Sequence, residues 1–169
     1  DKLGSAPIPT TRRAMPEQQP GLAADLAGRV YEDAPAYQVS REAIRAFARA
    51  VHAEHPAHTD VDAARALGHP DLIAPPTYAV VIAQAADAQL IQDPTAGIDF
   101  SRVVHADQRF THHRPIAAGD ELRAVVHVDA VRALGSGAMI TTREEIADAQ
   151  GNPVCTAVSS LLVRGEEQE

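Results

Sequence analysis

Histidines gather in one short stretch of this chain. Four of its eight histidines lie between Ala50 and Ala79, and three of them recur at intervals of three in the run His52-Ala53-Glu54-His55-Pro56-Ala57-His58, called the histidine motif below. Histidine ordinarily exchanges a proton near neutral pH, so acid/base chemistry is expected here. Pro56 disfavours helix at His55 and fixes the backbone direction, which predicts a helix end followed by a turn that presents His58.

The same spacing suggests a metal site, because zinc can be held by three imidazoles with a fourth position open. The three histidines share one helical face only if the helix continues through them, and Pro56 interrupts it. We therefore predict no metal site and no cofactor. His58 is then either an acid/base residue or a purely structural hydrogen-bonding residue.

Short helices must position the motif on both sides. Ser40 can cap a helix through REAIRAFARAV, whose apolar residues recur every three and four positions and lead into the motif. After the motif, Thr59 or Asp60 can cap a helix from Val61 to Leu67, which Gly68 ends.

The most apolar segment follows Pro75-Pro76 and runs from Thr77 to Gln92, where Asp93-Pro94 ends it. After its first turn its only polar residues are Gln84, Asp87, Gln89 and Gln92. Most of its surface must therefore be buried, which predicts a central helix.

The remainder of the chain predicts strands. The expected strands are Ala36 to Val39, Val103 to His112, Glu121 to Val131, Ala138 to Asp148 and Val154 to Arg164. Their turn-rich separators are typical of an antiparallel meander. A five-stranded antiparallel sheet wrapped around one long helix is the hot-dog fold, of the α+β class. A lone unit leaves an edge strand unpaired, so a dimer with side-by-side sheets is expected.

The composition excludes several kinds of partner. The chain has 169 residues, a net charge of -8, and no tryptophan. Such an acidic chain is a poor binder of nucleic acid or of an anionic membrane. An anionic acyl carrier would need a local basic patch, for which the candidates are Arg102, Arg109, Arg114 and Arg123. Scattered arginines are more often solvated, and His105 and Asp107, on the same strand face as Arg109, are expected to be solvated too.

The single cysteine, Cys155, excludes an intramolecular disulfide and fits a reducing cytoplasm. Its place in an alternating strand predicts a buried, unreactive thiol. No apolar run reaches the ~18–20 residues of a membrane span, and no signal peptide is evident. A soluble, cytoplasmic protein is expected.

The domain organisation is simple. Residues 1–20 are rich in proline and predict an extended N-terminal arm without a core. Met15 could be the native start, in which case Asp1 to Ala14 are a vector remnant. Residues 21–165 are expected to form a single hot-dog domain, and residues 166–169 a short tail.

The histidine motif resembles the motif G-D-x-N-P-L-H of the (R)-specific enoyl-CoA hydratases and MaoC-like dehydratases. The continuation HTDVDAARALGH, followed by LIAPPTYA, is most similar to the β-hydroxyacyl-ACP dehydratase subunits of fatty-acid elongation. The resemblance extends from Leu26 to Arg164. In that family the motif's Asp and His form the general acid/base pair, and substrate tunnels lie along a dimer seam.

This chain departs from the family motif in its catalytic pair. His58 is kept, but Ala53 stands at the Asp position and His52 at the Gly position. A methyl group cannot hold a proton, so either another side chain has taken over or the chain dehydrates nothing. Glu54, His55 and His52 are the candidate replacements for the missing Asp, and Ala53 and His55 are expected to contact substrate. Alternatively, polar residues at a helix end are simply at the surface.

The start of the central helix is the expected oxyanion site. The family commonly binds the thioester carbonyl with a backbone N–H at this point, where a helix has unpaired amides. Pro76 has no N–H, so the Thr77 and Tyr78 amides and the Thr77 hydroxyl remain as candidates. Pro-Pro-Thr is also simply a good helix start.

The resemblance implies action on acyl thioesters of coenzyme A or an acyl carrier protein, by hydratase/dehydratase-type addition or elimination at the α,β position. One alternative is a non-catalytic, acyl-binding subunit of a heterodimer whose partner keeps the Asp/His pair. Another is a diverged enzyme that adds an amine to an enoyl thioester or hydrolyses a thioester. A homodimer and a heterodimer both remain open.

Overall fold

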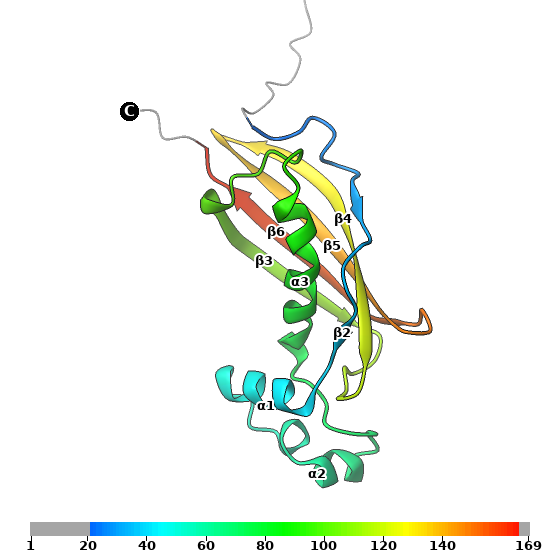
Figure 1. The fold of residues 1–169 in the computed structure, drawn as a ribbon. Coiled ribbons are helices and arrows are strands. Elements are labelled where there is room, and N and C mark those ends of the chain that lie inside the picture. The colour runs from blue at the N-terminus through cyan, green and yellow to red at the C-terminus, as the bar shows by residue number, and fades with distance from the viewer. Residues whose placement is uncertain (1–20, 166–169) are drawn as a thin grey trace, which may run out of the picture.

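The computed structural model describes residues 21–165, and their strands form one antiparallel sheet (Figure 1). The strands are β1 (Val30–Tyr31), β2 (Tyr37–Gln38), β3 (Val103–His112), β4 (Glu121–Leu134), β5 (Gly137–Asp148) and β6 (Pro153–Val163). Their order is β1-β4-β5-β6-β3, and β2 also pairs with β4. The antiparallel hot-dog sheet is confirmed, with β1 as a strand beyond the five predicted. The N-terminal arm and the C-terminal tail lie outside the described residues.

The long strands are not a simple meander. β4, β5 and β6 are successive hairpins, but β3, which precedes β4 in the chain, pairs with β6 at the other side of the sheet. Among the described strands β3 has a neighbour on one side only, so it is an edge strand. The loop from β3 to β4 is fixed by Asp120, which accepts hydrogen bonds from Arg114 at 2.8 Å and from the Ala117 amide at 2.9 Å.

Three α-helices and three 3-10 turns complete the described chain. They are α1 (Arg41–Ala50), η1 (Pro56–His58), α2 (Val61–Ala66), η2 (Pro76–Tyr78), α3 (Ala79–Gln92) and η3 (Phe100–Arg102). Figure 1 shows α3 lying across the sheet, with α1 and α2 gathered at one end of the molecule. In the part of the chain that the structure describes, no helix is long and apolar enough to cross a membrane.

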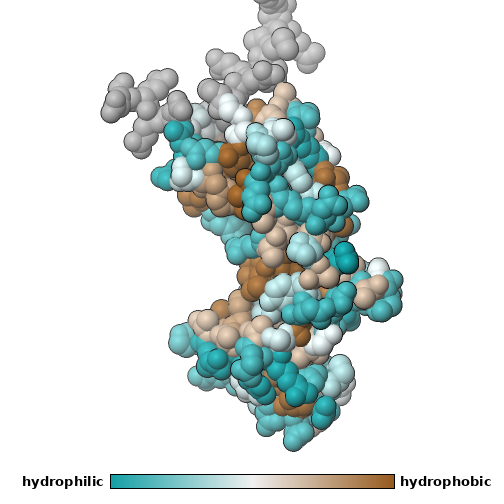
Figure 2. All heavy atoms as spheres, in the orientation of Figure 1, coloured by the Kyte–Doolittle hydropathy of each residue, from teal (hydrophilic) through white to brown (hydrophobic). Residues whose placement is uncertain are grey.

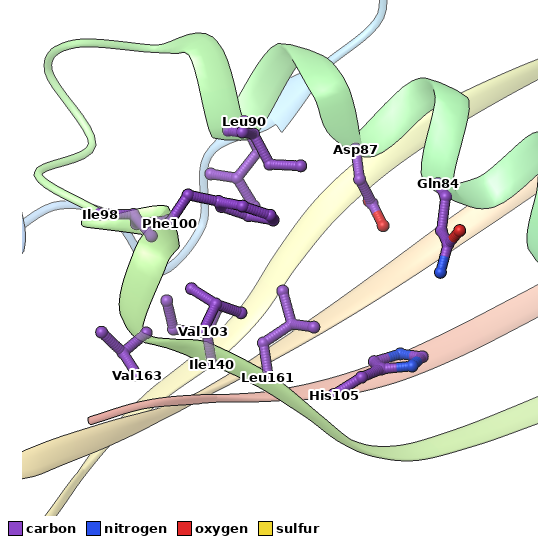
Figure 3. A pocket seen from close by; sticks show the side chains of 11 residues that line it. Gln84, Asp87, Leu90, Ile98, Phe100, Val103, His105, Ile140, Leu161 and Val163 are labelled. Carbon is purple, nitrogen blue, oxygen red and sulfur yellow. The ribbon is translucent and has the colours of Figure 1, made fainter.

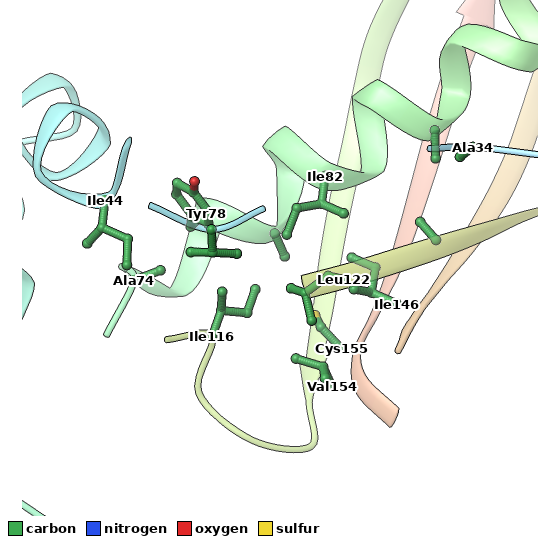
Figure 4. Close-up of a cluster of buried hydrophobic side chains, with 14 of the residues drawn as sticks. Ala34, Ile44, Ala74, Tyr78, Ile82, Ile116, Leu122, Ile146, Val154 and Cys155 are labelled. Atoms are coloured by element: carbon green, nitrogen blue, oxygen red, sulfur yellow. The ribbon is translucent and has the colours of Figure 1, made fainter. Parts of the chain in front are cut away.

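The central helix was expected over residues 77–92, and α3 occupies that segment after a first turn of 3-10 geometry. Its buried residues recur every three or four positions, at Ala79, Ile82, Ala83, Ala86, Asp87 and Leu90. The alanines let the helix approach the sheet closely, and Ile82 packs in a cluster with Leu122 and Ile146 (Figure 4). Each such buried aliphatic side chain contributes roughly 1.5–3 kcal/mol relative to exposure.

The surface carries both hydrophilic and hydrophobic areas. In Figure 2 hydrophobic residues reach the surface near the middle of the visible face, with hydrophilic residues on either side of them. Phe100, beside α3, and Val104, on β3, are among the large hydrophobic residues that are exposed, at 46% and 44%. The sheet edge at β3 is therefore partly apolar.

Candidate functional site

The histidine motif begins where α1 ends. The Ala53 amide donates to the Ala48 carbonyl at 2.8 Å and the His52 amide to Arg49 at 3.3 Å, which is the pattern of a Schellman motif. His52 is its left-handed residue, with φ of 54°. This conformation normally favours glycine, which gives a physical reason for the glycine of the family motif.

His58 lies in η1 and is only 8% exposed. Its Nδ1 is 2.7 Å from the Ile73 carbonyl oxygen. A carbonyl can only accept, so Nδ1 carries the proton and donates it, which leaves Nε2 of the neutral ring as the basic nitrogen. Nε2 makes no hydrogen bond to any described residue, so the ring is oriented while its basic atom remains available.

The carbonyl that orients His58 belongs to a well-anchored segment. The Ile73 amide donates to the Ala57 carbonyl at 3.1 Å, and the neighbouring Ala74 amide donates to Ile116 at 2.8 Å. The motif turn is thereby tied both to the chain before α3 and to the loop before β4. The Ile73 carbonyl therefore fixes the orientation of the His58 ring.

The first four residues of the histidine motif are more exposed than His58. His55 caps η1, because its Nδ1 accepts the Ala57 amide hydrogen at 3.2 Å, and its ring packs edge-on against His58 at 5.7 Å between centroids. Glu54 and His52 are exposed and Ala53 is half-buried. Among the described residues, neither Glu54 nor His52 forms a hydrogen bond or ion pair with His58. Their proposed catalytic roles remain predictions.

At the start of α3, the Tyr78 amide was expected to be a candidate donor to the thioester oxygen, but it is already hydrogen-bonded. The Tyr78 amide donates to the Pro75 carbonyl at 2.9 Å, so it is not available to a substrate. Its side chain is buried, its hydroxyl is 2.9 Å from that of Tyr37, and its ring packs against Phe47. Burial, and then the hydrogen bond with Tyr37, raises the pKa of Tyr78. Pro76 and Thr77 are exposed, which leaves the Thr77 amide and hydroxyl as candidate donors.

His112 is a residue at this site that the sequence did not reveal. It ends β3, and its Nε2 is 2.7 Å from the Pro76 carbonyl oxygen, to which it must donate. Its second ring nitrogen is then an acceptor at the helix start. No local signal in the sequence marks His112, because β3 and η2 are far apart in the chain and come together only in the folded structure.

An apolar cavity of about 330 Å³ lies farther along α3, between that helix, β3 and β6; it is called the α3 cavity below (Figure 3). Its lining consists of Gln84, Asp87, Leu90, Ile91, Ile98, Phe100, Val103, His105, Ile140, Leu161 and Val163. In Figure 3 the polar Gln84, Asp87 and His105 stand at one end, and Ile98 and Phe100 at the other. His105, expected to be mostly solvated, is exposed yet lines this cavity.

Asp87 is an unusual lining residue. It is 6% exposed, and it interacts electrostatically with Glu144, which lies on β5 and is fully buried. Burial, and then the charge of Glu144, raises the pKa of Asp87 to about 8, and burial also raises the pKa of Glu144. Asp87 is therefore mostly protonated at neutral pH. In the sequence, Asp87 stands out only as a polar residue of the central helix.

The residues between 21 and 165 contain no group of three or more His, Cys, Asp or Glu side chains arranged to hold a metal ion. The cysteine behaves as expected: Cys155 is buried, and burial raises the pKa of its thiol to about 11. A thiol in that state is a poor nucleophile at neutral pH.

The fold and the histidine motif together define a hot-dog protein of the hydratase/dehydratase type. The chain belongs to the family described as FAS1-like, dehydratase domain region, whose model matches residues 25–157. It is 51% identical to a UPF0336 protein of Saccharopolyspora erythraea over 142 residues, which cover 84% of this chain and 91% of that protein.

Solved structures agree with this family. The chain superposes on the C-terminally truncated HadBC complex of Mycobacterium tuberculosis, a 3R-hydroxyacyl-ACP dehydratase, with a TM-score of 0.76 and 31% identity, covering 83% of this chain and 99% of that one. A MaoC-like dehydratase gives a TM-score of 0.77 at 31% identity, covering 83% of this chain and 43% of that one. The resemblance to the MaoC-like family is confirmed.

Proposed function

We propose that this chain binds an acyl thioester of coenzyme A or an acyl carrier protein and catalyses addition or elimination at its α,β position. The observation that carries the proposal is His58, which is buried, oriented by the Ile73 carbonyl and left with an unbonded Nε2. Membership of a dehydratase family supports the class of reaction. The α3 cavity, at about 330 Å³, has the size of a small-molecule site and suits an acyl chain.

The chemistry needs one group that moves a proton and one that stabilises charge. In hydration, Nε2 of His58 takes a proton from water as the water oxygen bonds to the β-carbon and the double-bond electrons move toward the thioester oxygen. The Thr77 amide and hydroxyl stabilise that oxygen. The imidazolium then returns the proton to the α-carbon, and dehydration follows the same steps in reverse.

The decisive experiment uses the purified chain alone with crotonyl-CoA. Loss of the enoyl absorbance in water would support hydration, and the His58→Ala variant should abolish it. The same assay with added amines tests amine addition, and a thiol reagent for released coenzyme A tests thioester hydrolysis. If crotonyl-CoA and longer enoyl thioesters all remain unchanged in every arm, the chain is not an enzyme by itself.

A second candidate function is a non-catalytic, acyl-binding subunit. Two observations favour it. Ala53 supplies no carboxyl group, and β3 is an edge strand among the described strands, so a second hot-dog sheet can pair with it. The partner would be a hot-dog subunit with an intact Asp/His pair. Activity that appears only when the two subunits are mixed, and that survives His58→Ala in this chain, would select the subunit function over the catalytic one. A homodimer, a heterodimer and a cytoplasmic location all remain predictions.

A further inference from the structure

The peptide group between Pro76 and Thr77 joins the start of the central helix to the end of β3. Its carbonyl oxygen, which belongs to Pro76, accepts a hydrogen bond from Nε2 of His112 at 2.7 Å. Its amide hydrogen, which belongs to Thr77, makes no hydrogen bond to a described residue. The carbonyl and the amide of a trans peptide group point in opposite directions, so the Thr77 amide points away from His112.

The sequence makes this amide distinctive. Pro75 and Pro76 have no amide hydrogen, and the Tyr78 amide donates to the Pro75 carbonyl at 2.9 Å. Among residues 75–78, Thr77 alone therefore offers an unbonded amide. It does so at the helix end that carries partial positive charge, and Thr77 is exposed to a ligand.

The sheet holds His112 in place. Its backbone pairs with Cys155 of β6, and residues directly opposite each other in a sheet point to the same face. Cys155 is buried in the same cluster as Tyr78, so His112 lies on the face that carries α3 (Figure 4). The His112 ring lies beside Phe110, at 6.2 Å between centroids, and Phe110 packs against that cluster. A ring fixed in this way can hold the peptide group in one orientation.

The hydrogen bond from His112 has an electronic consequence for the amide. Donation to the Pro76 carbonyl draws electron density toward its oxygen and leaves the Thr77 amide hydrogen more positive. Linked hydrogen bonds strengthen one another in this way by perhaps 10–30% each. A stronger donor matters most where negative charge develops, so it stabilises a transition state more than a bound substrate.

We propose that His112 is a positioning residue of the oxyanion site. It orients and polarises the Pro76–Thr77 peptide group, so that the Thr77 amide binds the thioester oxygen as negative charge develops there. The inference rests on the proposed function, which assigns the Thr77 amide to that oxygen, and deepens it by adding the residue that controls this donor. His112 acts through the peptide group, whereas His58 moves the proton.

The first test needs binding but no turnover. Butyryl-CoA labelled with ¹³C at its carbonyl is bound to the full chain, and isotope-edited infrared spectroscopy gives the carbonyl stretching frequency, which falls as hydrogen bonds to the oxygen strengthen. We expect a lower frequency in the bound thioester than in the free one. His112→Ala should lose part of this shift, and His112→Gln, whose amide nitrogen can also donate to Pro76, should keep most of it.

Two further variants complete the set. His112→Phe keeps a ring beside Phe110 but cannot donate, so it should behave like His112→Ala, and it keeps the test decisive if the alanine variant does not fold. His113→Ala is the matched control: this neighbouring histidine is also exposed, and its Nε2 is 3.1 Å from Thr156 Oγ1. It should leave the frequency unchanged.

Turnover of crotonyl-CoA gives the second readout. His112→Ala should lower kcat about tenfold and leave KM nearly unchanged, a smaller loss than the ~10²–10³ that follows removal of an oxyanion donor itself. His112→Gln should restore most of the rate. A purely structural histidine would instead lower stability and thioester binding without this selective effect on kcat.

The outcomes separate this inference from the proposed function. An unchanged frequency and kcat in both His112→Ala and His112→Phe would overturn the role of His112, while turnover by the unmodified chain would keep the proposed function. Equal losses in the alanine and glutamine variants would also overturn it, because restoring the donor to Pro76 would have had no effect. If the unmodified chain leaves the butyryl-CoA frequency unshifted, the oxyanion site itself is absent and both fail. Gel filtration and circular dichroism of each variant confirm that it is folded.

Discussion

His58 is oriented by the Ile73 carbonyl, and under the proposed function its Nε2 is the base. If the chain is an enzyme by itself, His58→Ala should lower kcat by ~10² or more and leave thioester binding nearly unchanged, because proton transfer is lost rather than affinity. His55→Ala and His52→Ala keep this base and serve as controls. Equal losses in all three variants would indicate a structural histidine cluster.

Ala53 allows the complementary experiment. Ala53 is the last residue of the Schellman motif and is half-buried, so a larger side chain has a route to solvent. Ala53→Asp should raise water addition to crotonyl-CoA, because a second group that transfers protons and orients water is worth about 10²-fold. Enoyl absorbance measures the rate. A folded variant without any gain would show that the substrate is not placed beside residue 53.

His52 carries a conformational cost that can be removed. Its φ of 54° is one that residues with a side chain rarely adopt. His52→Gly should therefore increase the free energy of unfolding by about 1 kcal/mol, measured by urea denaturation. The control is Ala50→Gly in the last turn of α1, which should destabilise by about 0.5–1 kcal/mol. If both changes destabilise equally, the His52 side chain makes compensating interactions.

At the scale of the elements, the contact between α3 and β5 makes stability depend on pH. The native pKa of Asp87 is about 8, against an ordinary value of 3.8, so between these pH values the folded chain holds a proton that the unfolded chain releases. The free energy of unfolding contributed by Asp87 is then highest below pH 4 and falls as pH rises, by up to about 1.4 kcal/mol per pH unit. Glu144, whose pKa is also raised, acts in the same direction.

Asp87→Asn tests this dependence, because an amide has no proton to lose. Urea denaturation at pH 5 and pH 8 should show a stability advantage of the variant that is larger at pH 8. The difference between the variant and the original chain cancels most of the contribution of distant titratable groups. Glu144 and His105 are the titratable groups that face Asp87 from the sheet. A stability difference that does not change between the two pH values would place Asp87 in a solvated environment.

At the scale of the whole molecule, β3 has a neighbour on one side only among the described strands and carries the exposed Val104, and both features fit pairing of two sheets. Val104→Asp should convert a dimer to a monomer, because a carboxylate buried where two sheets pair is desolvated without a partner. Light scattering coupled to gel filtration measures the mass. Val30→Asp, at an equally exposed valine on the β1 side of the sheet, is the control and should stay dimeric.

Much of the fold could be predicted from the sequence because its signals are local. β3 was expected and is found at Val103–His112, and α3 follows Pro75-Pro76 and ends at Gln92, since alternation, helical spacing and breakers act over a few residues. The turn at Pro56 that carries His58 and the helix cap at Ser40 were expected for the same reason. The motif, with its missing Asp, likewise needs only neighbouring residues to be recognised.

The tertiary structure alone decided which distant residues meet. The pairing of β3 with β6, the contact of His112 with the Pro76 carbonyl, the inward turn of Tyr78 and the approach of Asp87 to Glu144 all join segments far apart in the chain. A residue's own neighbours in sequence do not fix such contacts, because strand order and helix placement depend on how the whole core packs. The same packing buries Asp87 and thereby changes its protonation, which composition and periodicity do not encode.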